Sequence, residues 1–195
     1  MPYPFYRYGS RPQERKTPSG PTPLPSRFVV LDTETTGIDP VRDRIVEIAI
    51  LTYANGALAD TYGILIHPER MMPPQATAVN GITDDMLIGQ PAFHEVAFDI
   101  RERIDGVTIV GYNVDFDIRF LTASFERLGL SIDLSRRIDV LALARRALPY
   151  GTVENHKLET IKRHFGIARG SHRATDDCLT TYDIMVRCRG AVERD

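Results

Sequence analysis

Hydrophobic and polar positions along the first half of the chain predict three neighbouring strands. The apolar run 28–32 is short and unbroken, as in a central strand of a sheet. Residues 45–53 alternate between apolar and polar side chains and predict a second strand. The pair Asn55-Gly56 is a strong signal for a tight turn, so 58–66 is expected to return beside the second strand. The three strands are therefore predicted to be antiparallel neighbours.

The rest of the chain combines short apolar runs with the three- and four-residue spacing of amphipathic helices. Strands are predicted at 107–111 and 138–140, and helices at 91–104, at 114–128, up to Ala147, at 157–165 and at 174–188. Three antiparallel strands followed by strand–helix alternation predict an α/β fold, in which a mixed sheet is flanked by helices.

The first 26 residues differ from the rest in composition. They contain seven of the thirteen prolines and four aromatic residues, without a periodic apolar pattern. Such a segment cannot form a core, and we expect residues 1–26 to be a proline-rich, disordered tail. The folded domain is then predicted to span 27–195, and 43% hydrophobic residues are enough for one core.

Composition also limits where the protein is expected to act. No apolar run approaches the ~18 residues of a membrane span, and the N-terminus lacks the apolar core of a secretion signal. Cys178 and Cys188, if both lie on the last helix, are ~15 Å apart along its axis and cannot form a disulfide. These features favour a cytoplasmic protein in a reducing compartment.

Four acidic residues occupy positions where a carboxylate is costly. Asp32 and Glu34, two residues apart at the end of the first strand, point to one face, with Thr33 opposite. Asp117 and Asp177 each fall on the apolar stripe of a predicted helix, so both are expected to face the core. Burying an ionised carboxylate is unfavourable by several kcal/mol unless it is paired or bound to a metal ion.

Divalent cations are the expected means of holding these four carboxylates together. Mg²⁺ or Mn²⁺ prefers oxygen ligands, whereas Zn²⁺ prefers histidine and cysteine. Two such ions ~4 Å apart would form a clamp for in-line phosphoryl displacement. His172 precedes Asp177 by five residues and is expected to accept the proton of the attacking water.

Positive charge is concentrated near the end of a chain whose formal net charge is −2. Residues 136–173 hold nine Lys or Arg and three acidic residues, a formal charge of +6. A local basic zone can hold phosphates, and it can equally be the solvated surface of helices.

The segments DTETTG, NVDFD and HRATDD together resemble the three motifs of the DEDDh, or DnaQ-like, superfamily of 3′→5′ exonucleases. The resemblance covers about residues 27–188 and includes NGIT at 80–83 and HKLETIKRHFGI at 156–167. It implies a ribonuclease H-like fold with a five-stranded mixed sheet. It also implies that the four carboxylates bind two divalent cations and that His172 is the catalytic histidine.

The resemblance further implies contacts with the substrate. Thr35 and Ile38 match positions near the terminal 3′-OH and the last base, and Asn113 and Phe116 match positions in the nucleotide pocket. Each residue also has a structural interpretation: Thr35 in a turn, Asn113 as a helix cap and Phe116 in the core.

The predicted function is therefore a 3′→5′ exonuclease that releases nucleoside 5′-monophosphates, mainly from single-stranded DNA with a free 3′ end. One alternative is an exoribonuclease or oligoribonuclease with the same chemistry and different contacts to the 2′-OH. A second is an inactive nucleic-acid-binding scaffold, which the complete set of five catalytic-type residues disfavours. A polymerase partner is compatible with the motifs, but the short segment after the last helix favours a free-standing enzyme.

Overall fold

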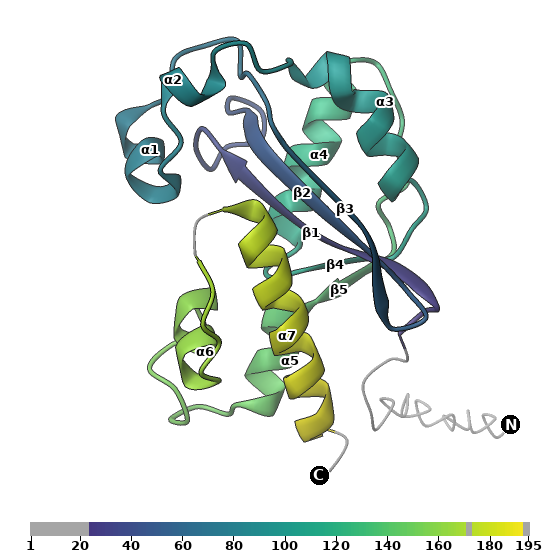
Figure 1. Cartoon of the computed structure of the whole chain (residues 1–195), viewed down its shortest axis with the longest axis vertical. Helices are drawn as coiled ribbons and strands as arrows, with labels where there is room; N and C mark the ends of the chain where they lie inside the picture. The colour runs from purple at the N-terminus through teal and green to yellow at the C-terminus, as the bar shows by residue number, and fades with distance from the viewer. Residues whose placement is uncertain (1–23, 171–172, 193–195) are drawn as a thin grey trace, which may run out of the picture.

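The computed structural model describes residues 24–192 except 171 and 172 (Figure 1). Its elements are, in chain order, β1 (Arg27–Thr35), β2 (Ile45–Ala54), β3 (Ala57–Leu65), α1 (Pro74–Asn80), α2 (Asp84–Leu87), α3 (Phe93–Ile104), β4 (Ile109–Gly111), α4 (Asp115–Arg127), β5 (Arg137–Asp139), α5 (Val140–Ala147), α6 (Leu158–His164) and α7 (Ala174–Val192).

The strands form one five-stranded sheet in the order β3-β2-β1-β4-β5. The pairs β1–β2 and β2–β3 are antiparallel, whereas β1–β4 and β4–β5 are parallel. The hairpin between β2 and β3 turns at Asn55 and Gly56, which have φ angles of 51° and 82°. These left-handed conformations suit a tight hairpin turn. The predicted mixed sheet and its antiparallel half are therefore confirmed.

The two faces of the sheet are covered by different helices (Figure 1). Phe28 and Val30 of β1 pack into one core with residues of α5 and α7. Val29 and Leu31 point to the opposite face and pack into a second core with residues of α3 and α4. This alternation follows from the two-residue period of a strand, and it decides which helix each later residue of β1 can meet.

The structure differs from the prediction most between β3 and α3. Two short helices, α1 and α2, lie in a segment for which no element was predicted. Helix α1 has Pro74 in its first turn and ends at Asn80, where Gly81 follows in the left-handed conformation; both are common helix boundaries. With only seven residues, α1 is too short to show a helical period in the sequence.

Other boundaries shift by a few residues. The helix predicted from 91 begins at Phe93, and the last helix continues to Val192. Both cysteines lie in α7 and are buried and free, as expected. Among the described residues, no helix is long and apolar enough to cross a membrane.

The predicted tail lies almost entirely outside the described residues. Of its last residues, Leu24 packs against the core that contains residues of α5 and α7. The backbone N–H of Asn55 donates to the carbonyl oxygen of Ser26 at 2.7 Å. These contacts attach residues 24–26 to the sheet, and the domain boundary at Arg27 stays a prediction.

Candidate functional site

Three carboxylates converge where β1 meets the first turn of α7. Asp32 and Glu34 continue the face of β1 that carries Val30, so both point toward α7. Asp177 lies in the first turn of that helix and is buried. One oxygen from each of these three side chains lies within 4.8 Å of the other two. The structure therefore brings together three of the four predicted metal ligands in one small cluster.

Asp117 approaches the same strand from the other face of the sheet. Strand β4 ends at Gly111, so it leaves the edge of β1 beyond Leu31 without a strand neighbour. The Thr33 N–H and hydroxyl both donate to Oδ1 of Asp117, at 3.0 and 2.7 Å. Asp117 thus occupies the edge position that a longer β4 would have filled. It lies beside the three-carboxylate cluster without belonging to it.

The close approach of β1 and α4 depends on a glycine. A Cβ on Gly111 would lie 3.2 Å from the Leu31 carbonyl oxygen and 2.9 Å from the Val114 side chain. Both distances are shorter than ordinary van der Waals contacts. The absence of a side chain at Gly111 therefore allows α4 to begin beside β1 and to present Asp117 to it.

The concentration of acidic groups changes their ionisation. Burial raises the pKa of Asp32 well above its ordinary range, and the charges of Asp117 and Asp177 raise it further. Burial likewise raises the pKa of Glu34 to about 7, with the charges of Asp177 and Glu47 adding to the effect. Burial also raises the pKa of Asp117 to about 7, although its hydrogen bonds act in the opposite direction. In the protein alone, the ionised forms of these three carboxyl groups are therefore unfavourable.

This arrangement fits a hard divalent cation. The clustered ligand atoms are all carboxylate oxygens, the type that Mg²⁺ and Mn²⁺ prefer. A cation among them would offset the burial and the mutual repulsion that together raise the pKa of Asp32 and Glu34. The donor set and its electrostatics thus support metal binding by Asp32, Glu34 and Asp177.

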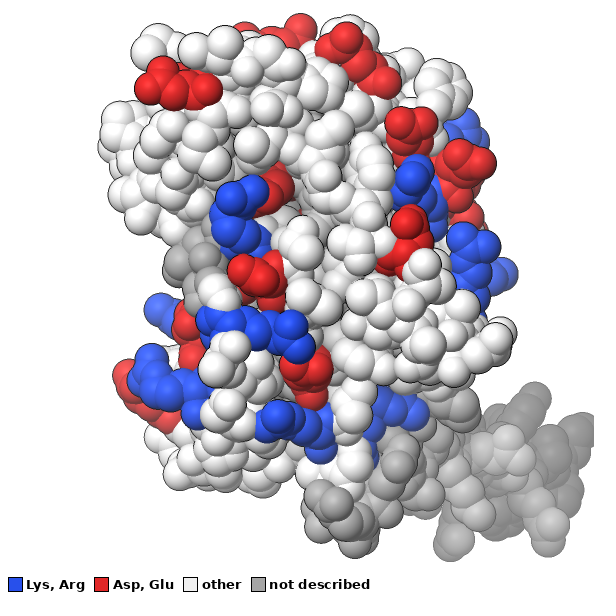
Figure 2. All heavy atoms as spheres, viewed as in Figure 1, with Lys and Arg blue, Asp and Glu red and all other residues white. Residues whose placement is uncertain are grey.

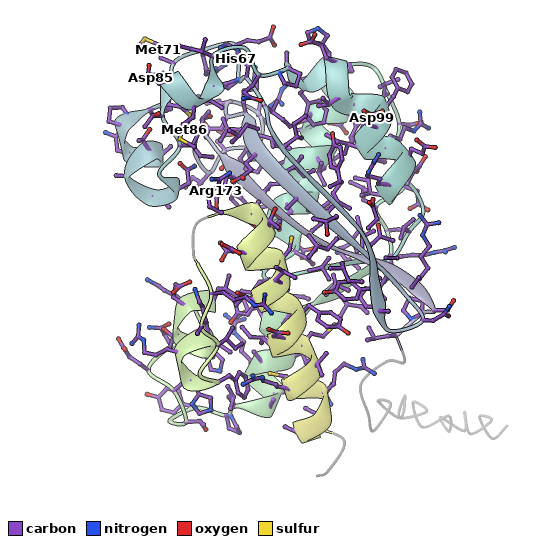
Figure 3. The ribbon with its side chains drawn as sticks, viewed as in Figure 1. His67, Met71, Asp85, Met86, Asp99 and Arg173 are labelled. Atoms are coloured by element: carbon purple, nitrogen blue, oxygen red, sulfur yellow. The ribbon has the colours of Figure 1, made fainter. Side chains whose placement is uncertain are left out.

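The sequence prediction missed an ion pair beside this cluster. Glu47 of β2 is buried and is the direct register partner of Glu34. Its carboxylate accepts hydrogen bonds from Arg173, the nearest at 2.9 Å, just before the start of α7. Figure 3 shows Arg173 at that end of the helix. A glutamate within an otherwise apolar strand was the available signal, because such a residue requires a partner.

A pocket of about 370 Å³ adjoins the carboxylate cluster and contains three of the four predicted substrate contacts. Glu34 and Thr35 form one wall, Phe116 of α4 forms another, and Ile38 stands at the rim with 84% of its surface exposed. The remaining lining residues are Thr33, Thr36, Gly37, Gln75, Ala76, Val79 and Asn80. The pocket is therefore built between the segment after β1, helix α1 and the start of α4.

Two hydrogen bonds order the wall of this pocket. The Thr35 hydroxyl donates to the Gly37 carbonyl oxygen at 2.5 Å, so Thr35 also has the turn role considered from its sequence. The Asn80 amide donates to the Thr35 carbonyl oxygen at 3.2 Å, which joins α1 to β1. Asn80 is the first residue of the NGIT segment, so this bond places that segment at the wall of the pocket.

Asn113 does not line this pocket. Its backbone is left-handed, with φ 62°, and its N–H donates to Asp139 at 2.9 Å. The residue before α4 that occupies the cap position is Val114, so the interpretation of Asn113 as a helix cap is wrong. Asn113 instead lines a separate cavity of about 800 Å³, together with Tyr112, Leu141, Arg145, Tyr150, Val153, Glu154, Asn155, His156, Lys157 and Leu158.

His172 lies outside the described residues, so its predicted role stays a prediction.

The basic zone at residues 136–173 is partly neutralised by ion pairs. Arg137 pairs with Asp115, and Arg169 pairs with Asp183. On the face drawn in Figure 2, basic and acidic side chains are interleaved over the lower half of the molecule. Arg145 and Lys157 of this zone line the 800 Å³ cavity.

Comparison with known proteins agrees with this geometry. A family model described as "Exonuclease" matches residues 29–185. The DNA polymerase III subunit epsilon of Treponema pallidum is 32% identical over 163 residues, which are 82% of this chain and 76% of that protein. A Staphylococcus saprophyticus protein named 3′-5′ exonuclease DinG is 34% identical over 160 residues, 82% of this chain but 18% of the relative.

A solved structure has the same fold. Exonuclease I of E. coli, in complex with a dT13 oligonucleotide, superposes with a TM-score of 0.71 and 23% sequence identity. The match covers 85% of this chain and 42% of the exonuclease I chain. The ribonuclease H-like fold and the DnaQ-like resemblance are both confirmed. The chain belongs to the exonuclease family and is a nuclease, a hydrolase of phosphodiester bonds.

Proposed function

We propose that this protein is a metal-dependent 3′→5′ exonuclease that acts on DNA. The observation that carries the proposal is the convergence of Asp32, Glu34 and Asp177 beside a pocket of about 370 Å³. Pockets of roughly 300–1,000 Å³ suit small ligands, and this one is suited to a single terminal nucleotide. The name of the Staphylococcus relative supports the 3′→5′ direction, and the exonuclease I complex with dT13 supports a DNA substrate.

The pocket residues would bind and orient the terminal nucleotide. Ile38 and Val79 offer exposed apolar surface to the base, and Phe116 offers an aromatic ring. Thr35 and Glu34 lie on the wall nearest the acidic cluster, where the terminal sugar would be held. Asn113 lines the separate cavity of about 800 Å³, so we assign it to a preceding nucleotide.

The acidic residues would serve the reaction centre. Asp32, Glu34 and Asp177 are the proposed ligands of divalent cations. Asp117 is the proposed fourth ligand, because among the neighbouring charges it contributes most to the raised pKa of Asp32. Two Mg²⁺ or Mn²⁺ ions bound there would activate water and stabilise charge on the leaving oxygen. His172 accepts the proton from that water. The water oxygen bonds to phosphorus, and the bond to the 3′ oxygen of the preceding nucleotide breaks. That oxygen takes up a proton to become the new 3′ hydroxyl, and a nucleoside 5′-monophosphate leaves.

A pocket for one nucleotide favours single-stranded or frayed 3′ ends. A paired terminal nucleotide must first unstack and unpair, which costs a few kcal/mol. We expect linear single-stranded DNA labelled at its 5′ end to shorten in single-nucleotide steps, with mononucleotides as the released product. Blunt duplex should be degraded more slowly, and circular single-stranded DNA should remain intact.

Gel electrophoresis of 5′- and 3′-labelled substrates checks this expectation. Cleavage of circular single-stranded DNA would show an endonuclease and would contradict the proposal. A matched RNA strand distinguishes the alternative function, because faster degradation of RNA would identify an exoribonuclease with the same chemistry.

Replacement of His172 by alanine should reduce turnover by roughly 10²–10⁴-fold, the usual contribution of a general base. Metal binding should persist, because His172 is outside the proposed ligand set. Single-turnover rates at saturating Mg²⁺, together with titration of Mn²⁺ into the variant, measure the two effects separately. A near-normal rate at neutral pH would contradict the assignment, and a parallel loss of metal affinity would identify His172 as a ligand.

A further inference from the structure

Glu47 has an environment that its position in a strand does not explain. It lies in β2, directly opposite Glu34 of β1, and only 5% of its surface is exposed. Two carboxylates at facing positions of an antiparallel pair repel one another. Arg173 supplies the opposing charge, with its Nη2 2.9 Å and its Nε 3.1 Å from Oε1 of Glu47.

The same carboxylate also holds the backbone where α7 begins. The N–H of Ala174, the first residue of α7, donates to Oε2 of Glu47 at 3.3 Å. Nε of Arg173 also lies 3.3 Å from this oxygen. Both oxygens of Glu47 are therefore engaged by residues at the start of the helix. Glu47 is not a member of the three-carboxylate cluster.

A short chain of bonds connects this ion pair to Asp177. The N–H of Asp177 donates to the carbonyl oxygen of Arg173 at 3.0 Å, in the first turn of α7. Glu47 is fixed to Glu34 by the β1–β2 register. The route from Glu34 to Glu47, to Arg173 and to Asp177 thus sets how far the helix carboxylate lies from those of β1.

We propose that Glu47 and Arg173 form a positioning clamp that holds Asp177 at metal-binding distance from Asp32 and Glu34. The inference rests on the proposed function, because it concerns the metal centre of that reaction. Glu47 touches neither substrate nor reacting atoms in this role. Its partners orient a ligand, and such outer partners affect metal affinity as well as turnover.

Two variants test the clamp while preserving most of its volume. Glu47→Gln keeps the shape of the side chain but removes the charge that holds Arg173. Arg173→Lys keeps the positive charge but loses the planar fork that makes two bonds to one carboxylate. Arg169→Ala is the matched control, because Arg169 forms an ion pair with Asp183 at the same 2.9 Å distance, away from the cluster.

The measurement is the affinity for Mn²⁺ without nucleic acid, by isothermal titration calorimetry on the full-length protein. We expect Glu47→Gln and Arg173→Lys each to weaken Mn²⁺ binding by roughly 10–100-fold, the usual effect of losing an outer partner. Arg169→Ala should bind Mn²⁺ as the parent does. In nuclease assays, the two clamp variants should need more metal for half-maximal rate, while KM for DNA at saturating metal stays unchanged.

Unchanged Mn²⁺ affinity in folded clamp variants would overturn the proposal, and so would an equal loss in Arg169→Ala. Circular dichroism melts establish that each variant is folded. If Glu47→Gln fails to fold, Arg173→Lys alone decides, because it retains the charge that neutralises Glu47. The calorimetry is independent of turnover. A parent that binds Mn²⁺ but degrades no nucleic acid would therefore refute the proposed function and still leave the clamp testable.

Discussion

Removal of divalent cations is expected to abolish nucleotide release, and Mg²⁺ or Mn²⁺ is expected to restore it. Asp32, Glu34 and Asp177 crowd three oxygens within 4.8 Å of one another, and protein groups alone leave the pKa of Asp32 and Glu34 raised. The reaction also places negative charge on the leaving oxygen, and bound cations stabilise such charge by several kcal/mol. Each 1.36 kcal/mol corresponds to about tenfold in rate, so the loss should be on the order of 10³-fold or greater.

The release of labelled mononucleotides from single-stranded DNA, before and after treatment with EDTA, provides the measurement. A back-titration with Mg²⁺ and, separately, with Mn²⁺ shows whether the loss is reversible. The control is the thermal denaturation of the EDTA-treated protein, which establishes that the fold persists without metal. Full activity in excess chelator would refute the metal-dependent mechanism.

Substitution of Asp32 or Asp177 by asparagine should combine a large loss of activity with a gain in metal-free stability. Each change removes a proposed ligand, so turnover should fall by about 10³-fold or more by the same free-energy relation. Replacing Asp177 removes a negative charge that raises the pKa of Asp32 and Glu34, and replacing Asp32 removes a buried carboxyl group whose own pKa is raised by burial and by its neighbours. In EDTA the variants should therefore unfold at a higher temperature than the metal-free parent.

The pH dependence of stability follows from the direction of these shifts. A carboxyl group whose pKa is raised in the folded state stabilises the fold when protonated, and this contribution is lost as pH rises through the folded pKa. For Glu34 the relevant window runs from its ordinary value of 4.5 to about 7. The melting temperature of the metal-free parent should fall across that window.

Thermal melts in EDTA at a series of pH values measure this dependence. Asp177→Asn should flatten it, because after burial the charge of Asp177 is the largest contribution to the raised pKa of Glu34, and added Mg²⁺ should flatten it in the parent. A metal-free Asp32→Asn variant that melts below the parent at pH 8 would contradict the electrostatic account.

The periodicity of each single strand or helix was sufficient to predict which way its acidic side chains face. The two-residue period of β1 determined that Asp32 and Glu34 share a face with Val30. Helical spacing determined that Asp117 and Asp177 face inward, and both are buried. These are properties of consecutive residues, so no knowledge of packing was needed.

Helices α1 and α2 were not predicted, although α1 supplies one side of the terminal-nucleotide pocket. Helices of seven and four residues show too few turns for a periodic pattern. Asn113 was assigned to the same pocket as Phe116, yet its left-handed backbone and its bond to Asp139 place it in the other cavity. That bond joins the segment after β4 to the last residue of β5, and such a contact between distant segments cannot be inferred from spacing.

The sequence by itself determined the order of the strands and of the helices from α3 onward, the faces of the acidic residues and the motifs that resemble the exonuclease family. Tertiary structure alone decided how those residues meet across elements. Because β4 ends at Gly111, the Thr33 N–H donates to Asp117 instead of to a neighbouring strand. The β1–β2 register places Glu47 opposite Glu34, and Arg173 neutralises Glu47 there. The physical reason is that side-chain direction is set by local backbone geometry, whereas charge compensation depends on distances between segments more than a hundred residues apart, such as Glu47 and Arg173.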